Sequence, residues 1–184
     1  MKITYKDIYS TYIKIKPYLK VTETSLSEQI SKKFGCNLFI KFENRQNTGS
    51  FKIRGAFSKL LSLSKKDKLK GVIGMSAGNH AQGLAYSGTK LGINTHIVMP
   101  LGTPFTKIRR TKNFGGKVYL EGNDLIESNN YVNTLKDKFG FIEVHPYNDE
   151  EVIKGQGTIY LEMTKQVSKL DYLLVPVGGG GLIA

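Results

Sequence analysis

Short apolar segments alternate with helical patterns along almost the whole chain, and this alternation limits the folds that are open to it. The apolar segments are rich in β-branched or aromatic residues, and several lack alternating polar positions, which is typical of buried parallel strands. We expect strands at residues 37–42, 71–75, 94–99, 117–120, 141–144 and 171–177. Their order along the chain indicates one strand, then one helix, repeated.

Helical patterns fill the intervals between these segments, and several of them end at a glycine. We expect helices around residues 8–15, 26–34, 53–60, 80–90, 106–114, 125–139 and 152–167. Ser50 is a possible N-cap of the third helix, and residues 182–184 look like the start of a further one. Strands and helices joined by short connections imply an open α/β sheet with right-handed crossovers. Ligands of such sheets collect at the carboxyl ends of the strands.

The formal charge of +12 comes almost entirely from scattered lysines, with the densest group at residues 65–70, which we interpret as a solvated loop. Lysine without interleaved arginine and aromatic residues is a weak nucleic-acid signal, so we expect no nucleic-acid partner, although a basic binding module is a competing hypothesis. A positive field would still favour anionic ligands.

Cys36 is the one cysteine, so no internal disulfide can form, which suits a reducing compartment. The N-terminal residues resemble no secretory signal, and no apolar run reaches membrane-spanning length. We expect a soluble, cytoplasmic protein with no membrane contact.

Four consecutive glycines, Gly178, Gly179, Gly180 and Gly181, follow the last apolar segment. They let the backbone bend so that several N–H groups converge on one anion, and a helix start behind them would add its positive dipole end. No Lys-Ser or Lys-Thr follows, so this is no nucleotide P-loop. A flexible turn or the start of a linker is the alternative.

A second small-residue turn, Ser76-Ala77-Gly78-Asn79-His80, follows the apolar segment 71–75 and opens a helix. Exposed N–H groups at a helix start, with two polar side chains, suit a carboxylate or another anionic group. The alternative is an ordinary capped turn in which Ser76 or Asn79 is the N-cap.

Lys52 stands out among the lysines because it is flanked by Phe51 and Ile53 and lies in the first turn of an expected helix. Partial burial and the helix dipole both lower the pKa of a lysine. Lysines activated in this way form Schiff bases with carbonyl compounds. The three histidines and the cysteine lack metal-ligand spacing, so we expect no metal site.

Four ordered blocks together resemble threonine dehydratase, a lyase family that uses pyridoxal phosphate (PLP) and has fold type II, the tryptophan-synthase-β type. The blocks are Lys-Phe-Glu-Asn-x-Gln-x-Thr-Gly-Ser-Phe-Lys-x-Arg-Gly-Ala at 41–56, Ser-Ala-Gly-Asn-His-Ala-Gln-Gly at 76–83, Gly-Gln-Gly-Thr at 155–158 and Pro-Val-Gly-Gly-Gly-Gly-Leu-Ile-Ala at 176–184. The resemblance runs from about Thr24 to the last residue. It implies three-layer, open, mostly parallel α/β sheets.

The resemblance also implies roles for named residues. Lys52 would carry PLP as a Schiff base and then act as the general base, with Phe51 packed beside the cofactor. Asn79 would bond the phenolic oxygen of PLP, and Ser76, Ala77, Gly78, Asn79 and His80 would hold the substrate carboxylate. The phosphate would be held by Gly178, Gly179, Gly180, Gly181 and the Leu182 amide. The substrates implied are L-threonine, which gives 2-oxobutanoate and ammonia, and L-serine, which gives pyruvate.

Ala77 separates this chain from one near relative. Serine racemases of this family tend to carry a second serine at that position, and alanine cannot transfer a proton. A dehydratase is therefore favoured, with a serine racemase-like enzyme as the alternative.

The family's catalytic unit continues beyond its glycine loop, whereas this sequence stops at Ala184. We expect residues 1–50 and 149–184 to belong to a large domain that is cut off, and residues 51–148 to form a complete small domain. An inactive truncated remnant is thus a further hypothesis. A full-length protein would be a homo-oligomer, and its biosynthetic or catabolic role stays open.

Overall fold

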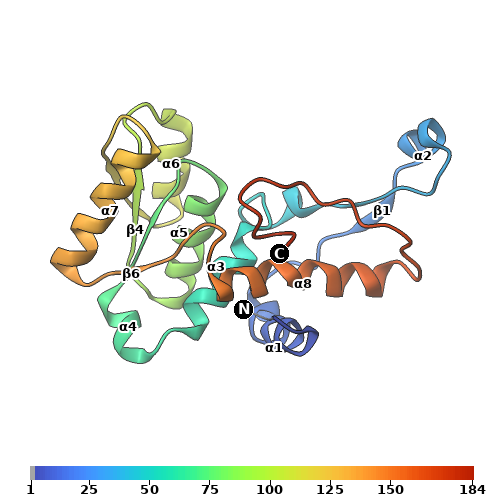
Figure 1. Cartoon of the computed structure of the whole chain (residues 1–184), viewed down its shortest axis with the longest axis horizontal. Helices are drawn as coiled ribbons and strands as arrows, with labels where there is room; N and C mark the ends of the chain where they lie inside the picture. Colours follow the sequence, from blue (N-terminus) through green and yellow to red (C-terminus); the bar gives the residue numbers. More distant parts are fainter. Residues whose placement is uncertain (1–2) are drawn as a thin grey trace.

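The structure, a computed structural model, describes residues 3–184. The chain is elongated, and helix α3 (Lys52–Ser62) joins its two ends (Figure 1). One end holds a parallel sheet with its helices, and the other holds the long helix α8 (Glu150–Gln166), helix α1 (Tyr5–Ile15) and a small strand pair. Because α3 packs against both α8 and α5 (Asn79–Leu91), its first residue lies where the two ends meet.

The sheet has four parallel strands in the order β5-β4-β3-β6. Their bounds are β3 (Val72–Met75), β4 (Thr95–Met99), β5 (Lys117–Leu120) and β6 (Ile142–Glu143). Each lies inside a segment that the sequence predicts as a strand, and all pairs are parallel. The predicted open α/β sheet is therefore confirmed.

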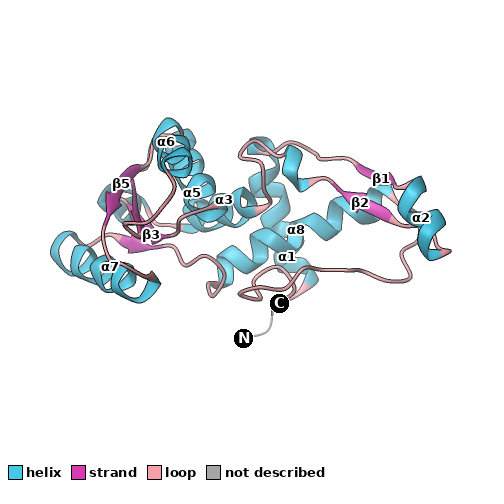
Figure 2. Ribbon diagram, turned by 90° about the horizontal axis from the view of Figure 1, so that it is seen from above, coloured by secondary structure: helices cyan, strands magenta, loops and turns pink. Residues whose placement is uncertain are grey.

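The sheet is the middle of three layers. Helices α5 and α6 (Phe105–Asn113) cover one face, and α7 (Leu125–Phe139) covers the other (Figure 2). Along β4, Ile97 and Met99 belong to the core under α5, whereas Val98 packs under α7 with Val132. Burial on both faces explains why the central strands β3 and β4 are apolar without strict alternation.

The second sheet is a short antiparallel pair at the opposite end of the molecule (Figure 2). It is formed by β1 (Thr24–Leu26) and β2 (Phe39–Lys41), with helix α2 (Glu28–Phe34) between them. Two 3₁₀ turns, η1 (Lys16–Tyr18) and η2 (Glu43–Arg45), flank this pair. The sequence predicts β2 but not β1, whose three residues carry no clear apolar pattern.

Polar caps begin several helices, and left-handed glycines end them. Thr4 and Asp7 form a capping box at α1, while Asp124 and Asp149 accept backbone hydrogen bonds at the starts of α7 and α8. Gly140 adopts φ +70° at the end of α7, a conformation that glycine tolerates best.

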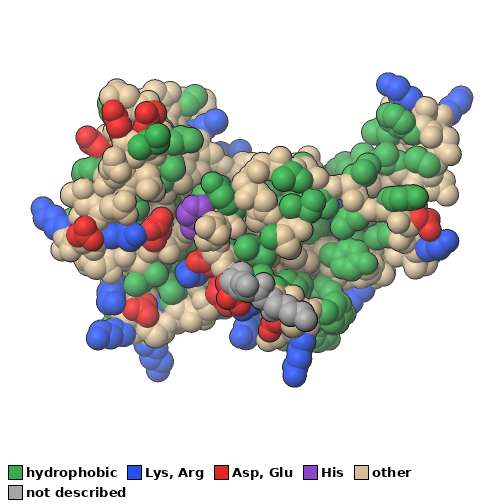
Figure 3. Space-filling model, in the orientation of Figure 1, with side chains coloured by type: hydrophobic (Ala, Val, Ile, Leu, Met, Phe, Trp, Pro, Cys, Tyr) green, Lys and Arg blue, Asp and Glu red, His purple; other side chains and the backbone are tan. Residues whose placement is uncertain are grey.

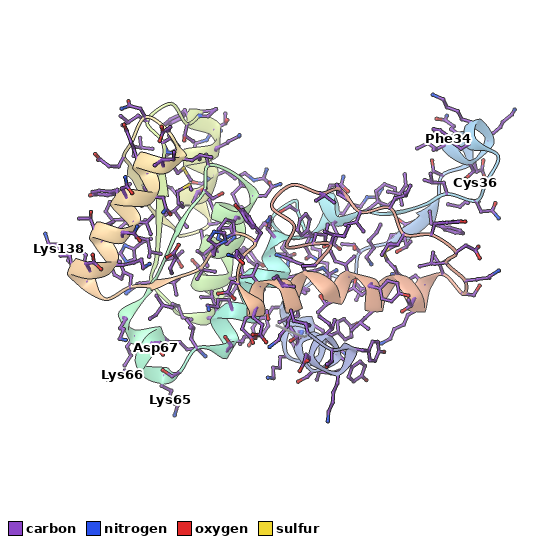
Figure 4. All side chains as sticks on the ribbon, viewed as in Figure 1. Phe34, Cys36, Lys65, Lys66, Asp67 and Lys138 are labelled. Carbon is purple, nitrogen blue, oxygen red and sulfur yellow. The ribbon has the colours of Figure 1, made fainter. Side chains whose placement is uncertain are left out.

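The lysine-rich segment 65–70 forms helix α4 (Lys65–Lys70), so its interpretation as a loop was wrong. The hydroxyl of Ser64 accepts a hydrogen bond from the Asp67 N–H and starts the helix. Lys65 and Lys66 project outward (Figure 4), so the helix presents its charges to solvent.

Two expectations at the end of the chain are wrong. Residues 171–177 form no strand, because no other described strand lies beside them to complete a ladder, and residues 181–183 form a turn rather than a helix. The segment returns along α8 towards the middle of the molecule (Figures 1 and 2). Tyr172 and Leu174 of this segment are 90% and 85% exposed. Apolar side chains gather over the middle and right of the molecule in Figure 3.

Among the described residues, none of the helices combines the length and apolar character that a membrane crossing would require.

Candidate active site

Lys52 is the first residue of α3 and lies half-buried between the two ends of the molecule. Its ammonium group donates a hydrogen bond of 2.7 Å to the carbonyl oxygen of Pro146 and lies 5.4 Å from the centre of the Phe51 ring. Burial lowers the pKa of Lys52 below its ordinary value. The amine therefore reaches its neutral, nucleophilic form at a lower pH than a solvated lysine does.

Ser50 does not cap α3, contrary to the sequence-based expectation. The N-cap position is held by Phe51 in a helical conformation, with no side-chain cap. A tight turn in which the Gly49 N–H bonds the Gln46 carbonyl leads into the helix, and it leaves the Ser50 hydroxyl buried without a partner. Within residues 3–184, the N–H groups of Lys52 and Ile53 make no hydrogen bond, whereas the Arg54 N–H donates to the Phe51 carbonyl.

A buried ion cluster fixes α3 directly behind Lys52. Arg54 has no exposed surface, and its guanidinium donates to both carboxylate oxygens of Glu43 and of Glu162 over 2.8–2.9 Å. Although burial alone lowers the pKa of Arg54, these hydrogen bonds raise it above its usual range. Lys41 adds a 2.8 Å ion pair to Glu162, so two cations face two anions.

The glycines of the block 155–158 let α8 approach α3 closely. A Cβ atom on Gly155 would lie 2.5 Å from the carbonyl oxygen of Arg54, and one on Gly55 would collide with the Gln156 side chain. Gln156 accepts a hydrogen bond of 3.3 Å from the Gly55 N–H. This block thus holds the helix that carries Lys52.

The block 76–83 forms the loop from β3 into α5. The Ser76 N–H bonds the Val98 carbonyl, and the Ser76 hydroxyl accepts a 3.1 Å hydrogen bond from the Gly78 N–H. Gly78 is the N-cap of α5 and makes no side-chain cap, so the alternative with Ser76 or Asn79 as N-cap is wrong. The start of this 13-residue helix is therefore open to a ligand.

His80 is buried, and its Nε2 lies 2.8 Å from the carbonyl oxygen of Val144. Because a carbonyl only accepts, Nε2 carries the proton and Nδ1 is the buried acceptor, which has no partner among the described residues. Burial lowers the pKa of His80 to about 4. His80 is thus a neutral anchor at neutral pH.

The glycine loop packs on the segment that leaves β6. A Cβ atom on Gly179 would overlap the Tyr147 ring, and one on Gly181 would lie 2.8 Å from the Tyr147 backbone. Gly178 and Gly180 instead face open space. Gly180, with φ +87°, closes a turn in which Ile183 and Ala184 donate to its carbonyl.

The three predicted motifs converge on the four residues Val144 to Tyr147. His80 binds Val144, Lys52 binds the Pro146 carbonyl, and the glycine loop packs on Tyr147. No hydrogen bond within residues 3–184 joins the other predicted site residues, Ser76, Asn79 and Leu182, to Lys52.

The sequence-based reasoning missed this segment and also Gly83. The segment 144–147 directly follows a predicted strand, so the rule that ligands gather at carboxyl ends could have indicated it. Gly83 lies in α5 where a Cβ atom would be 3.0 Å from the Ile53 nitrogen and 3.2 Å from the Lys52 carbonyl carbon. A glycine inside a helical pattern is the signal for such close approach.

The residues present fit PLP. Within the described chain, the N–H groups of residues 178–182 make no hydrogen bond, so the loop offers a row of donors to a phosphate. Lys52 has an amine of lowered pKa, and this amine donates a hydrogen bond to Pro146 in the segment 144–147, on which the glycine loop also packs. The cofactor needs these two features, an anion site and a nucleophilic lysine, in one place.

A three-layer parallel sheet, a half-buried lysine and a glycine loop on one segment define the class of PLP-dependent enzymes of fold type II. Residues 15–184 match the sequence profile of the family described as "Pyridoxal-phosphate dependent enzyme", and the chain belongs to this family.

Named relatives place the chain more closely. It is 43% identical to an "L-threonine ammonia-lyase" of Thermotoga maritima over 182 residues, which are 99% of this chain and 45% of the relative. It is 46% identical to an "L-threonine dehydratase catabolic TdcB" of Staphylococcus aureus strain N315, over 97% of this chain and 52% of the relative. A structure of maize serine racemase matches with a TM-score of 0.94 and 35% identity, over 97% of this chain and 54% of that one.

The chain therefore spans about half the length of the curated relatives it matches.

Proposed function

We propose that this chain carries the lysine-bearing half of a PLP-dependent dehydratase that converts L-threonine to 2-oxobutanoate and ammonia, and L-serine to pyruvate. The observation that carries the proposal is the convergence of Lys52, His80 and the glycine loop on residues 144–147. Relatives named as threonine dehydratases support the choice of substrate.

PLP, when bound, supplies the electron sink that lets a proton leave the α-carbon of an amino acid. Lys52 provides the amine that would hold the cofactor and then the base that would take this proton, because burial lowers its pKa and so favours the neutral amine more than in a solvated lysine. The N–H groups of residues 178–182 bind the phosphate, and Phe51 packs beside the ring. Asn79 orients the cofactor, and the backbone of Ser76 to His80 binds the substrate carboxylate at the start of α5.

A serine racemase is the second candidate, because a serine racemase matches the fold with a TM-score of 0.94. Racemization needs a proton donor on the face of the substrate opposite to Lys52. Ala77 has no ionizable group at the position where racemases of this family tend to carry serine. Elimination therefore remains the favoured reaction.

The domain boundaries belong to the proposal as well. Residues 51–148 make up the small domain, and residues 1–50 and 149–184 contribute to the large one, with α3 entering between them. We also propose a homo-oligomer and a cytoplasmic location, which the exposed, unpaired thiol of Cys36 suits.

Borohydride trapping tests the cofactor site. The protein is incubated with PLP, reduced, digested and mapped by mass spectrometry, in parallel with K52A and with K66A as a control on the exposed face of α4. We expect the label on the peptide of Lys52, its loss in K52A and its retention in K66A. Label spread over many lysines, or label retained in K52A, would contradict the site.

Product analysis tests the reaction. With L-threonine we expect 2-oxobutanoate, and D-serine formed from L-serine in excess of pyruvate would favour the racemase instead. Specific labelling of Lys52 without any turnover would favour the inactive remnant.

A further inference from the structure

We propose that His145 is a positioning residue of the site, whose imidazole holds the turn 145–148 in the shape that presents Pro146 to Lys52 and Tyr147 to the glycine loop. This role of His145 rests on the proposed function, in which Lys52 holds the cofactor and the glycine loop holds its phosphate. The shape of the turn itself rests only on contacts within it.

The turn 145–148 lacks the backbone hydrogen bond between first and last residue that closes many β-turns. Within the described chain, the N–H groups of Tyr147 and Asn148 have no backbone acceptor. Both donate instead to Nδ1 of His145, over 3.3 Å from Tyr147 and 2.8 Å from Asn148. Because a backbone N–H only donates, Nδ1 is the acceptor, and the proton of the neutral ring lies on Nε2. The side chain of His145 therefore fixes the path of the backbone through the turn.

One peptide unit links His145 to Lys52. The carbonyl oxygen of Pro146 accepts the 2.7 Å hydrogen bond from Lys52, and the N–H of the same peptide, which belongs to Tyr147, donates to His145. The peptide is trans and planar, so its C=O and N–H point in opposite directions. His145 and Lys52 thus hold one peptide plane from its two sides. A rotation of this plane would break both hydrogen bonds and displace the Lys52 amine.

The two ends of the turn are anchored by other elements, which leaves its middle to His145. Before the turn, the Val144 N–H donates a 2.8 Å hydrogen bond to the Ile73 carbonyl. After it, Asp149 caps α8, and its carboxylate pairs with Lys59 of α3 over 2.6 Å. Loss of the His145 acceptor should therefore loosen the turn without detaching it from the sheet or from α8.

The ring of His145 also contacts the side chain on which the glycine loop packs. The ring centres of His145 and Tyr147 lie 4.6 Å apart at an interplanar angle of 86°, an edge-to-face arrangement. A Cβ atom on Gly179 would overlap the same Tyr147 ring. His145 thus has two contacts with Tyr147, one through Nδ1 and one through the ring, and a test has to separate them.

Two substitutions make this separation. In H145N the side-chain oxygen is bonded to Cγ, as Nδ1 is in histidine, so it can accept the same N–H groups, but the ring is lost. In H145F the ring remains beside Tyr147, but the acceptor is lost. Urea unfolding of both variants shows that they are folded.

Amide exchange without cofactor tests the turn. We expect the Asn148 N–H to exchange at least about tenfold faster in H145F than in the parent chain, and within about twofold of the parent in H145N. Equal exchange in the parent and H145F, or fast exchange in H145N, would overturn the proposal.

The rate at which borohydride fixes PLP on Lys52 tests the link to the site. We expect this rate to be at least about tenfold lower in H145F and within about twofold of the parent in H145N. A normal rate in H145F with a low rate in H145N would assign the effect to the ring and overturn the proposal. Absence of labelling at Lys52 in the parent chain would contradict the proposed function, while the exchange of Asn148 would still decide whether His145 holds the turn.

Discussion

The ammonium group of Lys52 lies 2.7 Å from the carbonyl oxygen of Pro146, and the next residue, Tyr147, packs against the glycine loop. The amine and the row of free N–H groups are thus joined through two consecutive residues. Changes in the packing around these two residues should alter cofactor binding even where no chemical group of the site is removed.

Alanine at Gly181 should weaken PLP binding about tenfold, whereas alanine at Gly178 should change it by less than about twofold. A methyl group on Gly181 would lie 2.8 Å from the Tyr147 backbone, which cannot move aside cheaply, but a methyl group on Gly178 would meet nothing within 4 Å. Both variants keep the backbone N–H. Titration of cofactor absorbance measures the difference, and equal affinities in G178A and G181A would contradict this packing.

Alanine at Gly83 should slow the reductive labelling of Lys52 by about tenfold or more. Its Cβ atom would lie 3.0 Å from the Ile53 nitrogen, so α5 and the first turn of α3 must move apart. Gly102 is a matched control, since a Cβ atom there meets nothing within 4 Å. The rates of label incorporation in G83A and G102A give the result, and a normal rate in G83A would show that the close approach does not position Lys52.

Methionine at Arg54 should lower the free energy of unfolding by about 3–5 kcal/mol, because it leaves Glu43 without its buried cation and Glu162 with Lys41 alone. Methionine at Arg45, whose ion pair with Glu23 is more than half exposed, should cost about 0–1 kcal/mol. Urea unfolding of the two variants provides the comparison. A similar small loss in both would mean that the buried cluster contributes no more than a surface pair.

The stability of the protein should decrease as the pH falls from about 6.5 to about 4, in part because of His80. In the folded state the pKa of His80 is about 4, well below its ordinary value near 6.5. As the pH falls, the unfolded state therefore binds a proton at His80 first, and this lowers the free energy of unfolding by up to about 3 kcal/mol. Above pH 6.5 the contribution of His80 to the free energy of unfolding is constant. Urea midpoints of the parent chain and of H80Q across this pH range test whether His80 makes the protein less stable at low pH, since the variant lacks the titrating ring. Parallel curves for the two proteins would assign the acid sensitivity to other groups.

The sequence predicted those parts of the fold that depend on local patterns. The predicted strand 117–120 coincides with β5 (Lys117–Leu120), and Gly140 ends α7 as expected, because a short run with β-branched and aromatic residues and a left-handed glycine both leave local signals. The expected strand 171–177 did not form, because a strand needs a neighbour and local composition cannot supply one.

The three motifs of the site could be predicted from the sequence, but their convergence on one segment of the structure could not. Lys52 and the glycine loop are far apart in the sequence, and only the packing of α3 between α5 and α8 brings both to Tyr147 and its neighbour. The hydrogen bond to Pro146 uses a backbone carbonyl, a group that every residue carries, so no residue type marks it in advance.

Strand β6 is an edge strand that pairs with β3 over two residue positions, and Val144 adds one further hydrogen bond to the Ile73 carbonyl. The acceptors of His80 and Lys52 follow immediately on this short edge. A local opening that detaches β6 would therefore remove both acceptors at once, while the rest of the sheet stays folded. Amide exchange at Val144 should report this opening, and the lifetime of the assembled site should equal the lifetime of this small unit rather than that of the whole domain.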